Sequence, residues 1–297
     1  MNNFESMKKK QIELIKKDEL ISKFIKHYKF DDEFINDNFN IFNNCYTSIE
    51  MCKKCTGLNT CPQAKQGEFV GLTYNGLLNN NMVCCNKEIK KQEVIRHANS
   101  FVYSDIPMVH STVNLDNITV KESSLKQLYV MAYKILEGKT NKGLYIYGDL
   151  GVGKTYMSIA LANSLVDKGY KVSFIKLNDF VNKMFEYIKD DTVEYESVLD
   201  RVKKSDYLFV DDIGAENVTE FTRDRLLYNI LDYRMENKLC TIFTSNFDKK
   251  SLAKHFSSQD DISSKRLMER IDILTEDYCL TGKNKRRETI WLIKLEF

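Results

Sequence analysis

Short apolar runs alternate with amphipathic helical stripes through the last two-thirds of the chain. The apolar runs are typical of buried parallel strands and lie at 144–147, 172–175, 207–210 and 240–244. Between them apolar residues recur three and four positions apart, which predicts helices that include 125–136, 157–165, 180–188 and 226–233. Strands that alternate with helices favour a parallel sheet covered on both faces. We therefore expect an α/β fold for this part.

The first hundred residues have a different pattern. Helical stripes at 14–28 and 34–39 predict short helices, and the run 69–74 with the Asn-rich stretch after it predicts a β-hairpin. Residues 88–105 are polar and are interpreted as a connector. We place the domain boundary there, which gives a domain 1–97 and a domain 98–297.

Composition agrees with two unequal domains in a soluble protein. The chain has 297 residues, close to the size at which one hydrophobic core stops growing, with 43% hydrophobic and 29% charged residues. The net charge of +2 does not by itself indicate a nucleic-acid partner. No apolar stretch approaches the ~18–20 residues of a membrane span, and the polar start lacks a secretory signal. We expect a cytoplasmic protein whose eight cysteines are reduced.

The strongest motif is Gly148–Thr155, which fits G-x-x-x-x-G-K-[ST] with a predicted strand before it and a helix after it. Its backbone N–H groups and the helix N-terminus suit a polyphosphate. Lys154 is expected to reach the β- and γ-phosphates, and Thr155 to hold Mg²⁺. The predicted ATP contacts are Gly148, Asp149, Leu150, Gly151, Val152, Gly153, Lys154, Thr155 and Tyr156.

Polar residues follow two further strands. Asp211 and Asp212 end the run 207–210, and Asn246 comes two residues after the run 240–244. We expect Asp211 to bind Mg²⁺ and Asp212 to orient and deprotonate the attacking water. Asn246 is expected to hold that water or the γ-phosphate.

Cysteines cluster in the first domain. Cys52 and Cys55 form a C-x₂-C knuckle, and we predict a structural Zn²⁺ site completed by Cys61 and Cys85. Cys84 is the alternative to Cys85, and Cys45 is a fifth candidate. Four sulfur ligands leave no open position for water, so this site would stabilise the domain rather than catalyse.

The motifs, in their order, resemble those of AAA+ ATPases and, more narrowly, of bacterial replicative-helicase loaders of the DnaI/DnaC type. The cysteine region resembles the zinc-binding domain of the DnaI branch. The resemblance implies that Asn246 is the sensor 1 residue, Arg270 the arginine finger and Arg286 the sensor 2 residue. Arg266 and Arg287 stay open as alternatives for the last two roles. It also implies that no full helical lid follows the sheet.

The resemblance implies a Mg²⁺-dependent ATPase, weak alone, that binds the hexameric replicative helicase and helps to load it onto single-stranded DNA during replication initiation or restart. It further implies weak backbone contacts of 176–204 with that DNA and a possible homo-oligomer with helicase bound. An initiator that reads duplex DNA would need a helix-turn-helix module, for which the sequence shows no room. A transposase-helper AAA+ ATPase and a nucleotide-sensing adaptor with little turnover remain as alternatives.

Overall fold

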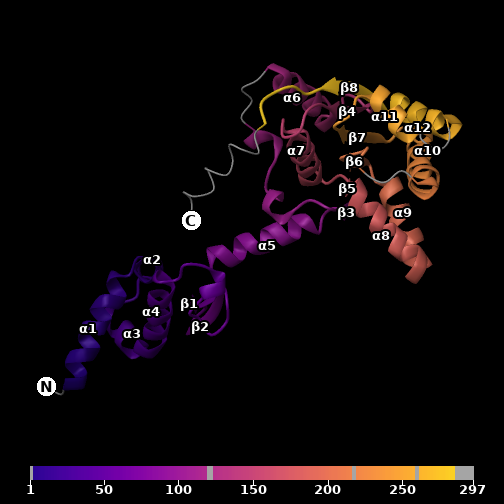
Figure 1. The fold of residues 1–297 in the computed structure, drawn as a ribbon. Helices are drawn as coiled ribbons and strands as arrows, with labels where there is room; N and C mark the ends of the chain where they lie inside the picture. Colours follow the sequence, from indigo (N-terminus) through magenta and orange to yellow (C-terminus); the bar gives the residue numbers. More distant parts are fainter. Residues whose placement is uncertain (1–2, 119–122, 216–218, 258–260, 285–297) are drawn as a thin grey trace. The chain divides into compact units, whose positions relative to one another are not determined.

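The computed structural model describes residues 3–118, 123–215, 219–257 and 261–284 (Figure 1). The chain divides into two compact units, Met1–Glu93 and Val94–Phe297. This division falls within helix α5 (Asn86–Ala98), which also contains the expected boundary at 97/98.

The first unit is a helical cluster that packs against a hairpin. Its elements are α1 (Asn3–Lys17), α2 (Glu19–Tyr28), α3 (Asp32–Asp37), α4 (Phe39–Lys53), β1 (Glu68–Tyr74) and β2 (Leu78–Cys84). The two strands are antiparallel, so the predicted hairpin is confirmed. Ile15, Ile21, Phe42, Ile49 and Leu78 are buried in one core that joins the helices to the hairpin.

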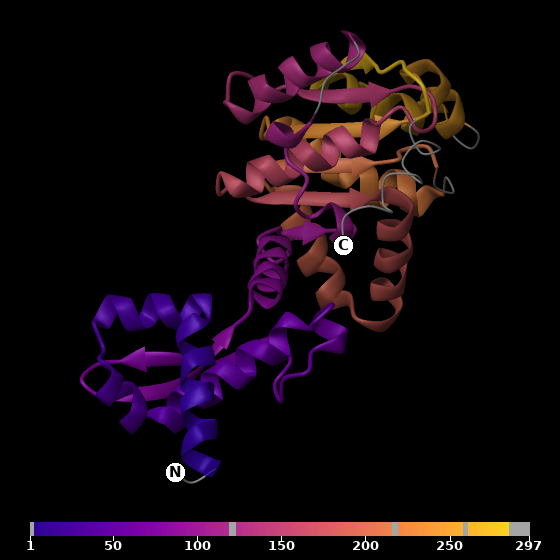
Figure 2. The same cartoon turned by 90° about the vertical axis from the view of Figure 1, so that its left-hand side faces the viewer.

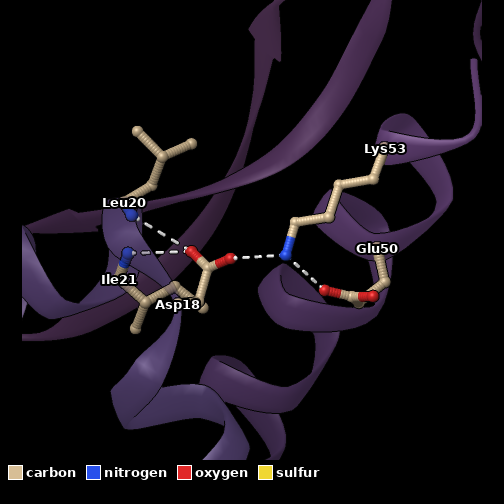
Figure 3. Close-up of polar contacts among 5 residues, drawn as sticks. All are labelled: Asp18, Leu20, Ile21, Glu50 and Lys53. Carbon is tan, nitrogen blue, oxygen red and sulfur yellow. Dashed lines mark hydrogen bonds and ion pairs between the residues drawn. The ribbon is translucent and has the colours of Figure 1, made fainter.

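A buried carboxylate ties the corner between α1 and α2 to Lys53 at the end of α4 (Figure 3). Asp18, 7% exposed, caps α2 by accepting from the backbone N–H groups of Leu20 and Ile21 at 3.1 and 3.3 Å. Its other oxygen accepts from Lys53 Nζ at 3.2 Å, and Lys53 also pairs with Glu50. Because Lys53 lies between Cys52 and Cys55, this contact fixes the knuckle relative to α2.

The connector is a helix, which the sequence analysis did not predict. Helix α5 has 13 residues and no buried side chain. Its Lys, Glu and Gln residues have high helix propensity, so the backbone can be helical without an apolar face. Polarity therefore predicted the exposure of this segment but not its conformation.

The second unit contains a six-stranded parallel sheet. Its strands are β3 (Tyr103–Ser104), β4 (Gly143–Tyr147), β5 (Val172–Lys176), β6 (Tyr207–Asp211), β7 (Cys240–Ser245) and β8 (Thr275–Cys279). Their order in the sheet is β3-β5-β6-β7-β4-β8, and every neighbouring pair is parallel. Figure 2 shows these strands side by side. The chain order reverses around β4 and β7, and such a switch point is where ligands bind in open parallel sheets.

Helices cover both faces, as the sequence predicted. Leu144 and Ile146 point into a core shared with α6 (Ser123–Leu136) and α7 (Lys154–Asp167). Tyr145, between them, belongs to the core on the other face. The helices of that face are α8 (Leu177–Asp190), α9 (Thr192–Lys204), α10 (Asn229–Glu236), α11 (Lys249–Phe256) and α12 (Asp261–Leu274). The α/β class is thus confirmed, with alternate strand residues buried on opposite faces.

Two details refine the expected elements. The helix predicted to include 226–233 begins as a π-helical segment, Phe221–Tyr228, and becomes α-helical at Asn229. After α12 the described chain continues as β8 and then without helix to residue 284. Among the described helices, none has the length and apolar character that spanning a membrane requires.

We predict that Asp18→Ala weakens the first unit more than loss of an ordinary helix cap does. The substitution removes two N-cap bonds and leaves Lys53 without its buried partner, so local opening of α2 should become easier by ~2–3 kcal/mol. Amide hydrogen exchange of α2 and α4 in the full chain would measure this. Asp31→Ala is the matched control, because Asp31 is exposed and caps α3 through Phe34 N–H alone. Equal effects of the two substitutions would contradict the role of the Asp18–Lys53 contact.

Candidate nucleotide site

The backbone of Gly148–Thr155 leads from the carboxyl end of β4 into the first turn of α7. Gly153 precedes the helix at φ 107°, a conformation that favours glycine. Since α7 begins at Lys154, its first N–H groups face the loop and make an anion site. The strand, loop and helix expected for this motif are confirmed.

Lys154 is buried, with 5% of its surface exposed. Its ammonium group donates to Gly148 O and Asp149 O at 2.8 and 2.9 Å. It also donates to Asn246 Oδ1 at 2.8 Å. The structure thus places Asn246, which follows β7, beside the lysine of the loop.

Asp211 ends β6 next to the loop and is 4% exposed. Its Oδ1 accepts from Thr155 Oγ1 at 2.9 Å and from Thr244 Oγ1 at 2.5 Å. The pKa of this carboxyl is raised to about 6, chiefly by burial and also by the neighbouring Asp212 charge, while hydrogen bonds from the two hydroxyl groups act in the opposite direction. The hydroxyl of Thr155 and the carboxylate are oxygen donors of the kind that Mg²⁺ prefers, so this pair fits the expected ion.

Asp212 adopts a left-handed backbone with φ 57°, which is uncommon for a residue other than glycine. Thr244 Oγ1 holds it by accepting from Asp212 N–H at 2.9 Å, and Asp212 O accepts from Ala215 N–H. This strained conformation turns the chain immediately after Asp211 and leaves the Asp212 side chain half-buried.

Thr244 is a site residue that the sequence analysis missed. Its single hydroxyl contacts both Asp211 Oδ1 and Asp212 N–H. Its position in the sequence could have predicted this role. Thr244 lies near the end of β7, two residues before Asn246, and β7 neighbours the strand that carries Asp211.

The remaining loop residues lie in unequal environments. Val152 is 1% exposed and packs in the core below α7, whereas Leu150 is 60% exposed. Tyr156 is half exposed, and its ring is edge-on to that of His110 at a centroid distance of 6.0 Å.

Of the predicted arginines, the structure describes Arg266 and Arg270, which both lie on α12. Arg270 Nε contacts Asp232 Oδ1 at 3.0 Å, and its other nitrogens contact Glu269 and Tyr228 OH. Arg266 is exposed on the same helix. Arg286 and Arg287 lie outside the described residues.

The predicted zinc ligands are half-buried in the first unit. Cys52 Sγ accepts from Gln63 Nε2, and Cys55 Sγ donates to Gly57 O. Backbone N–H donation, first from Gly67, lowers the pKa of the Cys61 thiol. The described residues nevertheless contain no group of three or more Cys, His, Asp or Glu that is already arranged to hold a metal ion.

The fifth candidate, Cys45, is a core residue. It is 3% exposed, and burial raises the pKa of its thiol to about 12. Because a metal ligand must be the thiolate, this environment disfavours ligation by Cys45.

A phosphate loop at the end of β4, an aspartate pair after β6 and an asparagine after the intervening β7 define an ATP-binding protein of the AAA+ class. The family model of IstB-like ATP binding proteins matches residues 63–288. The chain belongs to this family.

Individual relatives agree with this assignment. The replicative helicase loader DnaI of Bacillus subtilis is 28% identical over 96% of this chain and 94% of its own length. A crystal structure of DnaI matches with a TM-score of 0.55 and 32% identity, covering 64% of this chain and all of that one. The replicative helicase loader DnaC of Escherichia coli is 24% identical over 56% of this chain and 68% of its own length.

We predict that Asp211→Asn stabilises the nucleotide-free protein while removing its response to Mg²⁺. Asparagine keeps the oxygen that accepts from Thr155 and Thr244 but carries no buried charge. The ionised carboxylate is disfavoured by the fold above the pKa of about 6, so the gain should be ~1–2 kcal/mol at pH 7.5. It should fall to about half near pH 5, where the carboxyl is protonated in the folded chain but not in the unfolded one, and vanish only below pH ~4, where both are protonated.

Urea unfolding at pH 7.5 and pH 5, with ATP titrations with and without Mg²⁺, would check this. A variant that is less stable than wild type at pH 7.5 would contradict the assigned cost of burying the charge.

Proposed function

We propose that this protein is an ATP-dependent loader of the replicative helicase. The observation that carries the proposal is the likeness to the Bacillus subtilis loader, which spans 96% of the chain and therefore includes the first unit as well as the ATPase core. A transposase-helper ATPase would share the core, but the family model that both would match begins only at residue 63. The residues before 63, which lie outside the family model but within the likeness to the Bacillus subtilis loader, therefore favour the loader.

In this proposal the chain binds ATP and hydrolyses it. Lys154 contacts the β- and γ-phosphates, exchanging its present backbone acceptors for phosphate oxygens. Thr155 and Asp211 hold Mg²⁺, which when bound neutralises charge on the phosphate oxygens. Asp212 orients the attacking water and accepts its proton, and Asn246, already beside Lys154, holds the water or the γ-phosphate.

The arginine roles belong to the same proposal. Arg270 would act on the nucleotide of a neighbouring copy, leaving its contact with Asp232 in the assembled state. Arg286 would contact the γ-phosphate as the sensor 2 residue. A loader works in the cytoplasm, where the replicative helicase meets its DNA.

We propose that the hexameric replicative helicase binds through the first unit and that ATP occupancy in the second unit controls assembly and release. A ligand shifts such an equilibrium only by its differential affinity for the two states, so ATP must favour one assembly over the other. An adaptor that binds ATP with negligible turnover would use the same surfaces but would not cycle.

Weak contact with single-stranded DNA is proposed for α8 and α9. Phe185 is 46% exposed, and Lys189 Nζ lies 4.6 Å from the centre of its ring, which pairs a stacking surface with a cation. Lys203 and Lys204 both pair with Asp200, so their charge is partly compensated. Contacts of this kind follow the backbone and weaken with salt.

A mixing experiment tests the partner. We expect the purified chain to co-elute with the replicative helicase of its own organism, with an ATP-dependent change in the size of the complex. Lys154→Ala should lose nucleotide binding and therefore that dependence, while it keeps the first unit intact. Size-exclusion chromatography with light scattering measures both, and absence of co-elution with and without ATP would refute the loader assignment. ATP turnover measured with helicase and single-stranded DNA present distinguishes the loader from the adaptor.

We also propose that Cys52, Cys55, Cys61 and Cys85 hold a structural Zn²⁺. Two contacts support the set: Cys55 N–H donates to Cys52 O across the knuckle, and Gly67 joins Cys61 to Cys85. In the second, Gly67 N–H donates to Cys61 Sγ, while Gly67 O accepts from Cys85 N–H at 2.7 Å. Amide donation to sulfur stabilises the thiolate that zinc requires.

Metal analysis of variants tests this site. We expect one zinc per wild-type chain, loss of zinc in Cys55→Ser and Cys85→Ser, and weaker helicase binding in both. Cys84→Ser is the matched control and should keep the metal. Zinc that remains at one per chain in Cys55→Ser would show that the ligand set is wrong.

A further inference from the structure

The chain that follows β8 runs along the phosphate loop. β8 pairs in parallel with β4, and Tyr147 lies opposite Cys279. Beyond the strands the two chains stay together, because Leu280 N–H donates to Tyr147 O at 2.7 Å. Gly148 lies so close that an added Cβ would overlap the carbonyl oxygen of Leu280. Parallel neighbours end at the same edge of a sheet, so β8 delivers the residues after it to the loop.

Helix α6 also contacts this segment. Ser124 Oγ donates to Thr281 O at 2.9 Å, and Tyr278 OH donates to Ser124 O. Leu280 is therefore held at the loop and Thr281 at α6, while residues 281–284 stay exposed to solvent.

The side chain of Asn284 lies on Gly151. An added Cβ at Gly151 would lie 3.0 Å from Asn284 Nδ2 and would overlap Oδ1. Gly151 also has φ 79°, so a larger residue would be strained there in any case. The side-chain amide of Asn284 has N–H donors and an oxygen acceptor. It thus lies beside Gly151, just before the part of the loop whose backbone N–H groups would bind phosphate.

We propose that Leu280–Asn284 forms a third wall of the nucleotide site and that Asn284 binds the triphosphate by donating from its side-chain amide. This proposal rests on ATP binding at the phosphate loop, as proposed above. Lys154, which reaches the β- and γ-phosphates, contacts Gly148 O and Asp149 O. Asn284 lies on Gly151, in the middle of the same loop. In this proposal its amide contacts the γ-phosphate, so Asn284 favours ATP over ADP.

The test replaces the amide by a carboxylate of the same shape. Asn284→Asp puts an acceptor-only negative charge against the phosphate, so we expect ATP affinity to fall at least tenfold and ADP affinity less than threefold. Asn284→Ala, which only removes the donors, should weaken ATP binding by a smaller factor. Titration of the full chain with fluorescent ATP and ADP analogues measures both, and Asn141→Asp is the matched control. Asn141 is exposed just before β4, at the opposite end of the strand from the loop.

The outcomes separate this inference from the function. Wild-type chain that binds ATP together with an Asn284→Asp variant that binds both nucleotides normally would overturn the inference and leave the function standing. Wild-type chain that fails to bind ATP would overturn both. Equal losses of ATP and ADP affinity, accompanied by a lower unfolding temperature without nucleotide, would show that Asn284 only packs against the loop and would also overturn the inference.

Discussion

The second unit depends on one buried carboxylate. Asp211 Oδ1 accepts a hydrogen bond from the Thr155 hydroxyl on α7 and another from the Thr244 hydroxyl on β7. A single atom at the end of β6 therefore joins three elements. Removing a charge from water is unfavourable, and two neutral hydroxyl donors offset only part of that penalty, which is why the carboxyl pKa rises. A divalent cation at the same oxygens would supply the missing counter-charge. The fold therefore holds a local instability at the position where magnesium and triphosphate would bind, and binding would relieve it.

How far the sequence could predict this site follows from the topology. The motif of the phosphate loop predicts the strand before it and the helix after it. The two aspartates lie at the end of β6 and Asn246 follows β7, and β7 lies between β6 and β4 in the sheet. Local patterns of this kind can be recognised in the sequence without knowing how the side chains pack. Thr244 carries no motif of its own, because a threonine at a strand end is common and only its contact with Asp211 and Asp212 gives it a role. Leu280 and Asn284 were missed for a related reason: their neighbours in space, Gly148 and Gly151, are more than 130 residues away in the sequence.

Packing also decides what polar patterns left open. The connector α5 showed no apolar stripe, so periodicity gave no reason to predict a helix. Cys45 and Cys52 lie on the same helix, yet one is buried in the core and the other half-buried. Spacing alone could not make that distinction, whereas burial does, through its effect on the thiol pKa. In the second unit, Asn163 shows the same dependence on context: it is 1% exposed and donates to His110 O and Val113 O, which fastens the segment before α6 to the helix of the phosphate loop.

The contacts of Arg270 bear on how assembly could be coupled to nucleotide. Its side chain is 17% exposed and pairs with Asp232, which is 31% exposed, so water screens this ion pair in part. Pairs of this kind contribute only ~0–1 kcal/mol, and Arg270 also lies over the Tyr228 ring. A triphosphate offers a larger charge and bidentate geometry, so exchange of Asp232 for a neighbour's nucleotide would be favourable once two copies approach. Arg266, one helical turn earlier and exposed, would lie at the same surface and could contact the neighbouring copy without breaking that pair. An intrachain partner is thus compatible with the proposed role in trans, because it would keep the guanidinium ordered before a neighbour's nucleotide bound.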